Sequence, residues 1–153
     1  MKTVNKVILT ASLLFSGLSF ASNNIEMYKS PSCGCCTQWA NIMEQKGYQV
    51  DIHQQQDWTN VKREFGMPAK LQSCHTAIID GYLIEGHVPE KEVARLLKER
   101  PQGIKGLAAP GMPMHSPGMP MHSPGMAKPG DEYKGFDVIA FHDDGTTSVY
   151  AEY

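Results

Sequence analysis

Runs of apolar residues and alternating positions predict four strands in the first part of the chain. Ile25 to Tyr28 is a short apolar run, and residues 48–53 alternate between apolar and polar, which is the period of a half-buried strand. Thr76 to Ile79 and Tyr82 to Ile84 flank Asp80-Gly81, a dipeptide that favours the tight turn of a two-residue hairpin. We therefore expect two separate strands followed by a β-hairpin.

Apolar residues at helical spacing predict three helices between and after these strands. The first begins within a cysteine-rich segment and places Trp39 and Met43 on one face. The second follows Asp57, which can cap it, and the third has Pro89 as its first residue and Pro101 at its end. The resulting order, β-α-β-α-β-β-α, is that of a thioredoxin-like α/β domain with cysteines between the first strand and the first helix.

Proline and glycine are so frequent in residues 103–130 that we expect regular structure to lapse there. Within this Met/His-rich loop the sequence GMPMHSP occupies residues 111–117 and is repeated letter for letter at 118–124. Two apolar runs in residues 131–153 flank Asp143-Asp144-Gly145, which predicts a C-terminal β-hairpin. An isolated hairpin is only marginally stable, so we expect it to pack on the domain.

The N-terminus has the features of a signal peptide over residues 1–21. Two lysines precede the apolar run Val7 to Leu18, and small residues at Ser19 and Ala21 complete a cleavage pattern. We expect cleavage near Ala21 and a single exported domain over residues 22–153. A retained membrane anchor is the alternative, which the short apolar run disfavours.

Charge and composition exclude several classes of function. The formal net charge is -2 and no basic stripe occurs along the chain, so we expect no nucleic-acid partner. No serine is accompanied by a paired base and orienting acid, so no hydrolase is indicated. Nothing beyond the leader suggests a membrane span, so we expect no membrane association once the leader is removed.

Three of the four cysteines crowd into one segment as Cys33, Cys35 and Cys36, and the fourth is Cys74. In an oxidising compartment they could form two structural disulfides, and sequence does not choose among the three pairings. Cys33 and Cys36 have the C-x-x-C spacing at a helix start, where free N–H groups and the helix dipole stabilise a thiolate. Because a thiolate serves both disulfide exchange and soft-metal binding, this position favours two functions.

Additional ligand types favour metal over disulfide exchange. Cys35 is surplus to an exchange pair, and His75 follows Cys74 directly. Five methionines, among them Met112 and Met119, are interleaved with two histidines in the loop, and thioether and imidazole together indicate copper. The alternative for the loop is a disordered segment whose methionines cover an apolar surface. His87 precedes a helix, and either turns toward the cysteines or simply occupies a turn.

Five motifs in order resemble the CopG-type family of periplasmic copper-resistance proteins of Gram-negative bacteria. They cover essentially the whole chain after the leader and consist of Cys33-Gly-Cys-Cys36 with Trp39, Ser73-Cys74-His75-Thr76-Ala77, Gly81-Tyr82, Glu85-Gly86-His87-Val88-Pro89, and Pro110-Gly111-Met112-Pro113 with a later Ser-Pro-Gly-Met. One departure is the expansion of the last motif into the repeat, which leaves open whether Met112 or Met119 occupies the family position.

The resemblance implies a thioredoxin-like domain that binds several Cu(I) ions in a thiolate-bridged cluster. Carried over to this sequence, the ligands are Cys33, Cys35, Cys36, Cys74, His75, His87, Met112 and Met119. It also implies a periplasmic location, a role in copper resistance, and copper-export or copper-chaperone proteins as partners. Interconversion of Cu(I) and Cu(II) is suspected in the family, so a copper oxidoreductase and a passive copper buffer both stay open. A thiol–disulfide oxidoreductase of thioredoxin-like type is the competing hypothesis.

Overall fold

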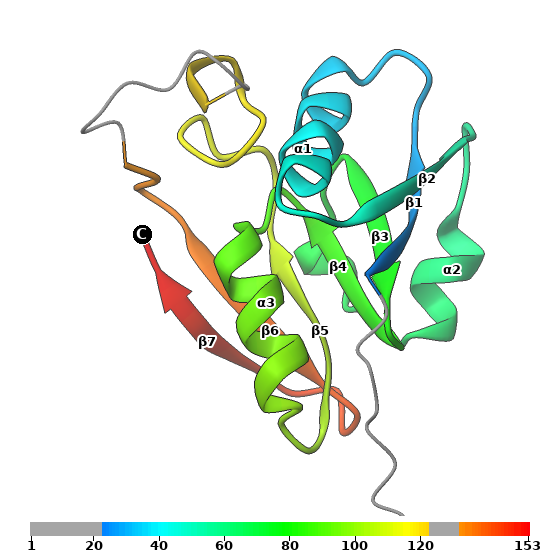
Figure 1. Ribbon diagram of the computed structural model, residues 1–153. Coiled ribbons are helices and arrows are strands. Elements are labelled where there is room, and N and C mark those ends of the chain that lie inside the picture. Colours follow the sequence, from blue (N-terminus) through cyan, green and yellow to red (C-terminus); the bar gives the residue numbers. More distant parts are fainter. Residues whose placement is uncertain (1–22, 123–131) are drawn as a thin grey trace, which may run out of the picture.

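Seven strands and three α-helices make up the described part of the chain, which a computed structural model gives as residues 23–122 and 132–153 (Figure 1). The strands are β1 (Asn24–Lys29), β2 (Gln49–Gln54), β3 (His75–Ile79), β4 (Tyr82–Gly86), β5 (Ile104–Ala109), β6 (Asp137–His142) and β7 (Thr147–Glu152). The α-helices are α1 (Gly34–Gln45), α2 (Thr59–Glu64) and α3 (Glu90–Glu99), and two 3-10 turns are η1 (Ala69–Leu71) and η2 (Pro120–His122).

Two predictions concern parts of the chain outside the described residues. The expected signal peptide, residues 1–21, lies there, and so does the end of the Met/His-rich loop. Within the described ranges, no helix combines the length and apolar character needed to cross a bilayer.

All seven strands pair in one sheet in the order β2-β1-β3-β4-β5-β6-β7. β1 runs parallel to β2 and antiparallel to β3, and β4 runs antiparallel to β3. The end of β1 therefore lies beside the start of β3, with Lys29 opposite His75, and the end of β4 lies there too, with Glu85 opposite Thr76. The segment after β1, the start of β3 and the segment after β4 consequently meet at the same end of these three neighbouring strands.

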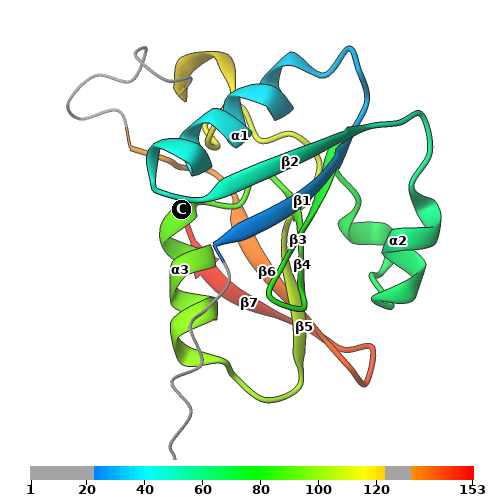
Figure 2. The ribbon, with the colours of Figure 1, turned by 45° about the vertical axis from the view of Figure 1, so that its right-hand side comes forward.

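The helices cover both faces of this sheet. α1 and α3 lie on one face and α2 lies on the other (Figure 2). The larger core joins Trp39 and Met43 of α1 with Val93 and Leu96 of α3 over the inner face of the sheet. A smaller core packs Met67 and Leu71 with Leu83, Ala108 and Phe141 on the opposite face. Burial of these apolar side chains is the main term that stabilises the two layers against the sheet.

The predicted order of the first seven elements matches the structure, but the expected lapse of structure from residue 103 is wrong. Ile104–Ala109 forms β5, which pairs parallel with β4 and antiparallel with β6 near the middle of the sheet. Gly106 is required there, because a Cβ would collide with the carbonyl oxygen of Leu83 and the ring of Phe141. In the sequence, a glycine that is needed for close packing cannot be told from a glycine that interrupts a strand, so β5 was not predicted.

Two smaller predictions also differ from the structure. Ile52, expected on the buried side of its strand, is 38% exposed because β2 is the edge of the sheet. Pro89, expected as the first helical residue, is the extended N-cap of α3, which begins at Glu90. The last two strands, β6 and β7, pair antiparallel, and β6 continues the sheet beside β5.

Residues 111–122, here called the covering segment, fold back over the start of α1. Gly111 forms a parallel bridge with Ser73, and its N–H donates to the carbonyl of Gln72 at 3.1 Å. The N–H of Gly118 donates to the carbonyl of His122 at 3.1 Å, which closes a compact turn. Gly118 itself lies directly on the backbone of Cys35 and Trp39. The described part of the loop is thus an ordered cover on the cysteine-bearing helix start.

Candidate metal centre

The first turn of α1 carries three of the four cysteines. Cys33 is the extended N-cap, and Cys35 and Cys36 are the second and third helical residues. The first amide N–H groups of a helix have no partner within the helix and carry the positive end of its dipole. No acidic residue occupies this turn, so no side-chain charge within it offsets the positive end of the dipole.

Cys33 and Cys36 form a disulfide, with their Cα atoms 5.4 Å apart. This pairing is one of the three that the sequence left open, and Cys35 and Cys74 are free thiols. The sulfur of Cys35 lies 3.6 Å from that of Cys33. Supplying four thiolates to a metal from this state therefore requires reduction of one bond by two electrons.

The second group of ligands comes from the start of β3, where Cys74 and His75 lie beside the helix turn. The sulfur of Cys36 is 3.5 Å from the carbonyl oxygen of Cys74. The Nδ1 atom of His75 is 3.7 Å from the sulfur of Cys74. Residues separated by 38 positions in sequence are thus in direct contact, because β3 pairs with the strand that leads into α1.

A buried carboxylate fixes the backbone around Cys74. Glu85 is fully buried on β4 and accepts hydrogen bonds from the N–H of Ser73 at 2.7 Å and the hydroxyl of Thr76 at 2.5 Å. Lys62 of α2 donates to the same carboxylate at 2.8 Å. Burial raises the pKa of Glu85, and the three donors oppose that rise. The residues on both sides of the Cys74-His75 pair are therefore held by one anchor.

His87, just after β4, presents one nitrogen to Cys74. Its Nδ1 atom lies 2.6 Å from the carbonyl oxygen of Pro117, and a carbonyl can only accept, so Nδ1 carries the proton. In the neutral ring Nε2 then holds a lone pair, and it lies 3.0 Å from the sulfur of Cys74. A hydrogen bond on the far nitrogen is the usual way in which a protein orients a metal-binding histidine.

His75 and His87 pack together under Trp39. The ring centroids of His75 and Trp39 are 4.7 Å apart, and those of His75 and His87 are 5.0 Å apart. The indole N–H of Trp39 donates to the carbonyl of Val88 at 2.8 Å, which holds the His87 segment against α1. Within the described residues the Nε2 atom of fully buried His75 has no hydrogen-bond partner. An unsatisfied buried nitrogen is costly unless something else binds it.

These side chains converge into two overlapping sets of candidate ligands. One consists of Cys33, Cys35, Cys36 and Cys74, and the other of Cys36, Cys74, His75 and His87. Within each set the ligand atoms all lie within 4.8 Å of one another. Four cysteine sulfurs and two imidazoles thus surround one small volume, which in the reduced protein is a donor set for soft or borderline metal ions.

The protonation states suit a metal that displaces thiol protons. Burial, followed by the charge of Cys35, raises the pKa of Cys74 to about 12, so its thiol is protonated at neutral pH. Burial lowers the pKa of His87, and burial together with the charges of His87, Lys62 and Lys29 lowers that of His75. Both imidazoles are therefore neutral at pH 7, the form in which they bind metals.

Two solved structures titled copper resistance protein CopG match the chain over nearly their full length. Form 1 is 37% identical with a TM-score of 0.73, and the match covers 85% of this chain and 96% of that chain. Form 2 is 36% identical with a TM-score of 0.71, covering 85% of this chain and 97% of that chain. The chain belongs to the CopG family of copper resistance proteins. The profile of a protein family of unknown function, DUF411, matches residues 71–119, and a search of the curated proteins finds no match.

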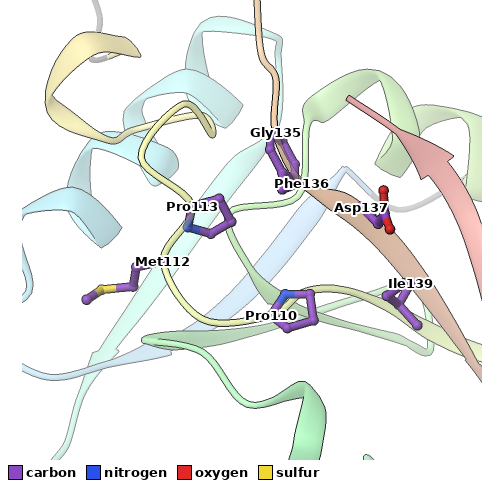
Figure 3. Close-up of a pocket in the computed structure, with 7 residues that line it drawn as sticks. All are labelled: Pro110, Met112, Pro113, Gly135, Phe136, Asp137 and Ile139. Atoms are coloured by element: carbon purple, nitrogen blue, oxygen red, sulfur yellow. The ribbon is translucent and has the colours of Figure 1, made fainter.

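The two methionines predicted as ligands of this CopG-family site occupy different environments. Met112 is 56% exposed and lines an open groove with Pro110, Pro113 and Phe136, and its side chain points away from the other lining residues (Figure 3). Met119 is 7% exposed, and its neighbours Gly118 and Pro120 line a pocket with Gly34, Cys35 and Gln38. The second copy of the repeat, which carries Met119, therefore lies over the cysteine-bearing turn.

Sequence reasoning missed the residues that orient this CopG-family cluster. Glu85, Trp39 and Pro117 act through hydrogen bonds to backbone or ring atoms of residues 12 to 49 positions away. Glu85 alone carried a usable signal, because a charged residue within an apolar strand is rarely fully buried without partners.

Proposed function

We propose that this chain is an exported, periplasmic copper-binding protein of copper resistance that carries Cu(I) as its cargo on a thioredoxin-like domain. Its family membership supports the link to copper resistance. The observation that carries the rest is the convergence of four cysteine sulfurs, with Cys36 and Cys74 common to both ligand sets. Thiolate selects Cu(I) over harder ions, and shared thiolates let few residues hold several ions.

More than one Cu(I) ion is proposed because the site has two partly separate halves. Cys33 and Cys35 are half-buried at the helix start, whereas His75 and His87 are fully buried beneath Trp39. An ion near the helix start and an ion near the imidazoles would share the sulfurs of Cys36 and Cys74. Met119, in the segment over the first half, is the thioether proposed to shield the outer ion, and exposed Met112 the one proposed to capture copper first.

We also propose that the protein interconverts Cu(I) and Cu(II). Oxidation of the Cys33 and Cys36 thiolates to their disulfide releases two electrons, which reduce two Cu(II) ions to two Cu(I) ions. The Cys33–Cys36 disulfide is the form of the pair that this step would leave. A dithiol reductant would return the site to its reduced form, and copper-export or copper-chaperone proteins are the proposed recipients of the ions.

Thiol–disulfide exchange on proteins is the alternative, and the Cys33–Cys36 disulfide at a helix start favours it. An exchange enzyme needs only that pair, yet Cys35, Cys74, His75 and His87 also line the site. Metal binding uses all six groups, so we prefer it.

Anaerobic titration of the reduced protein with Cu(I), against a coloured Cu(I) chelator, tests the proposal. We expect wild type to hold more than one Cu(I) ion and Cys74→Ser to lose more than one, because its sulfur belongs to both halves. The disulfide form should hold fewer ions than the reduced form. A reduced protein that leaves Cu(I) with the chelator, yet reduces a protein disulfide through Cys33, would replace this function by the alternative.

A further inference from the structure

The duplicated sequence brings together two histidines that neither cysteine-containing ligand set includes. His115 and His122 are the fifth residues of the two GMPMHSP copies. Their ring centroids lie 5.7 Å apart with an angle of 71° between the ring planes. The pair exists because this sequence carries a second copy of the motif.

Backbone hydrogen bonds of the covering segment hold the two copies in this fold. The N–H of Ser116 donates to the carbonyl of Pro113 at 3.0 Å, and the N–H of Met119 donates to that of Ser116 at 3.3 Å. The bond from Gly118 to the carbonyl of His122 then returns the chain toward His115. The two imidazoles are therefore brought together by ordered turns.

The ring geometry suits two imidazoles that share one metal ion. A histidine nitrogen binds a first-row ion at about 2.0–2.1 Å, which places the centroids of two rings on one ion within about 6 Å of each other. The observed separation lies inside that limit. The large angle between the planes also shows that the rings are not stacked face to face.

Tyr133, in the segment before β6, packs against one ring of the pair. His122 is buried, and its ring centroid lies 5.1 Å from that of Tyr133, with an angle of 68° between the ring planes. An aromatic side chain from the segment before β6 thus packs on one ring of the histidine pair.

We propose that His115 and His122 form a second copper site that takes Cu(II), separate from the cysteine cluster. Imidazole nitrogen with oxygen suits Cu(II), and Cu(II) binds such sites more tightly than the other divalent first-row ions do. The choice of copper rests on the proposed function, whereas the existence of a divalent-cation site rests on the histidine geometry alone. Two sites would let the chain hold copper in both oxidation states.

The test uses the full chain with Cys35→Ser and Cys74→Ser, which keeps the Cys33–Cys36 disulfide and leaves no free thiol to reduce Cu(II). One equivalent of Cu(II) should give an electron paramagnetic resonance spectrum with couplings to imidazole nitrogen. Adding His115→Ala and His122→Ala should weaken binding at least about 100-fold. His53→Ala and His142→Ala are the matched control, because those histidines bond to Glu26 and Ser148 on other strands.

A measurement without histidine substitutions guards against a misfolded variant. In the Cys35→Ser, Cys74→Ser protein, substoichiometric Cu(II) should first broaden the ring NMR signals of His115 and His122 and spare those of His53 and His142. Binding that survives loss of His115 and His122 but not His87→Ala would overturn the proposal, since the copper would belong to the first site. Because this protein lacks the thiolate cluster, failure here is independent of a failure of wild type to bind Cu(I).

Discussion

Cys74 and Cys36 supply the two sulfurs that the thiol half and the imidazole half of the site share. Cys74 keeps its proton at neutral pH because it is buried beside other sulfurs, while the nearest imidazole nitrogen lies 3.0 Å away. A metal ion that enters must therefore replace that proton. Binding of Cu(I) should release protons, and the apparent affinity should rise with pH.

The raised pKa of Cys74 predicts unusual thiol reactivity in the metal-free protein. In the disulfide form of Cys35→Ser, Cys74 is the single free thiol. Burial, the larger cause of the raised pKa, remains in this variant, although the charge of Cys35 is removed. The alkylation rate of Cys74 should therefore still rise about tenfold per pH unit between pH 8 and 10, where a thiol of ordinary pKa levels off, because only the thiolate reacts. The rate is measured with iodoacetamide and mass spectrometry. A plateau at or below pH 9 would contradict the account of a buried, protonated thiol.

Most of the candidate ligands could be selected from the sequence one residue at a time. The four cysteines with His75 and His87 could be selected from residue type and motif, since thiol and imidazole are the groups that soft metals require. The pairing of Cys33 with Cys36 could not be derived, because several pairings satisfy the same sequence. The positioning roles of Glu85 and Trp39 could not be predicted either, because they depend on hydrogen bonds that form only when distant strands and helices pack.

At the scale of elements, the covering segment packs on α1 where the backbone at Gly118 lies against the backbone of the helix. A Cβ on Gly118 would lie 2.6 Å from the amide nitrogen of Trp39 and 2.8 Å from the carbonyl oxygen of Cys35. Gly111 opens the other copy of the repeat with a similar positive φ, yet nothing lies within 4 Å of its Cβ position. The repeat thus supplies a substitution and its own control.

Gly118→Ala should destabilise the metal-free protein more than Gly111→Ala does. Both substitutions place a side chain at positive φ, which costs about 1–2 kcal/mol. Only Gly118→Ala adds a clash with α1, which costs about 1–3 kcal/mol more or lifts the segment off the helix. Urea unfolding measures the difference between them. Equal losses of unfolding free energy would show that the segment does not pack on the cysteine turn.

The buried pair of Glu85 and Lys62 connects β4 and α2 to the Cys74 segment, and it gives a second prediction for elements. Glu85→Gln leaves the Lys62 charge without its partner in a buried place, so we expect a loss of about 3–5 kcal/mol in unfolding free energy. Glu26→Gln is the control, because Glu26 contacts His53 on the surface with both side chains 41% exposed, and exposed pairs of this kind contribute about 0–1 kcal/mol. Similar losses in both variants would remove Glu85 as the anchor.

For the whole molecule, the order of the first seven elements could be predicted because each has its own periodicity and end signals. The interior strand β5 could not, because Gly106, Ala108 and Ala109 have neither the β-branched side chains nor the alternation of a strand. The absence of a side chain at Gly106 is what the packing between β4 and β6 requires, and that requirement appears only in the assembled sheet. The ordered fold of the covering segment could not be predicted from the sequence for a similar reason. It depends on the contact of Gly118 with a helix about 80 residues earlier in the chain.

X-ray absorption at the copper edge, on reduced protein loaded anaerobically with Cu(I), tests most directly whether sulfurs from both parts of the chain hold the cargo. The account predicts a first shell dominated by sulfur, a second copper ion as a near neighbour, and loss of that neighbour in Cys74→Ser. A first shell of nitrogen or oxygen, or a spectrum that Cys74→Ser leaves unchanged, would contradict it.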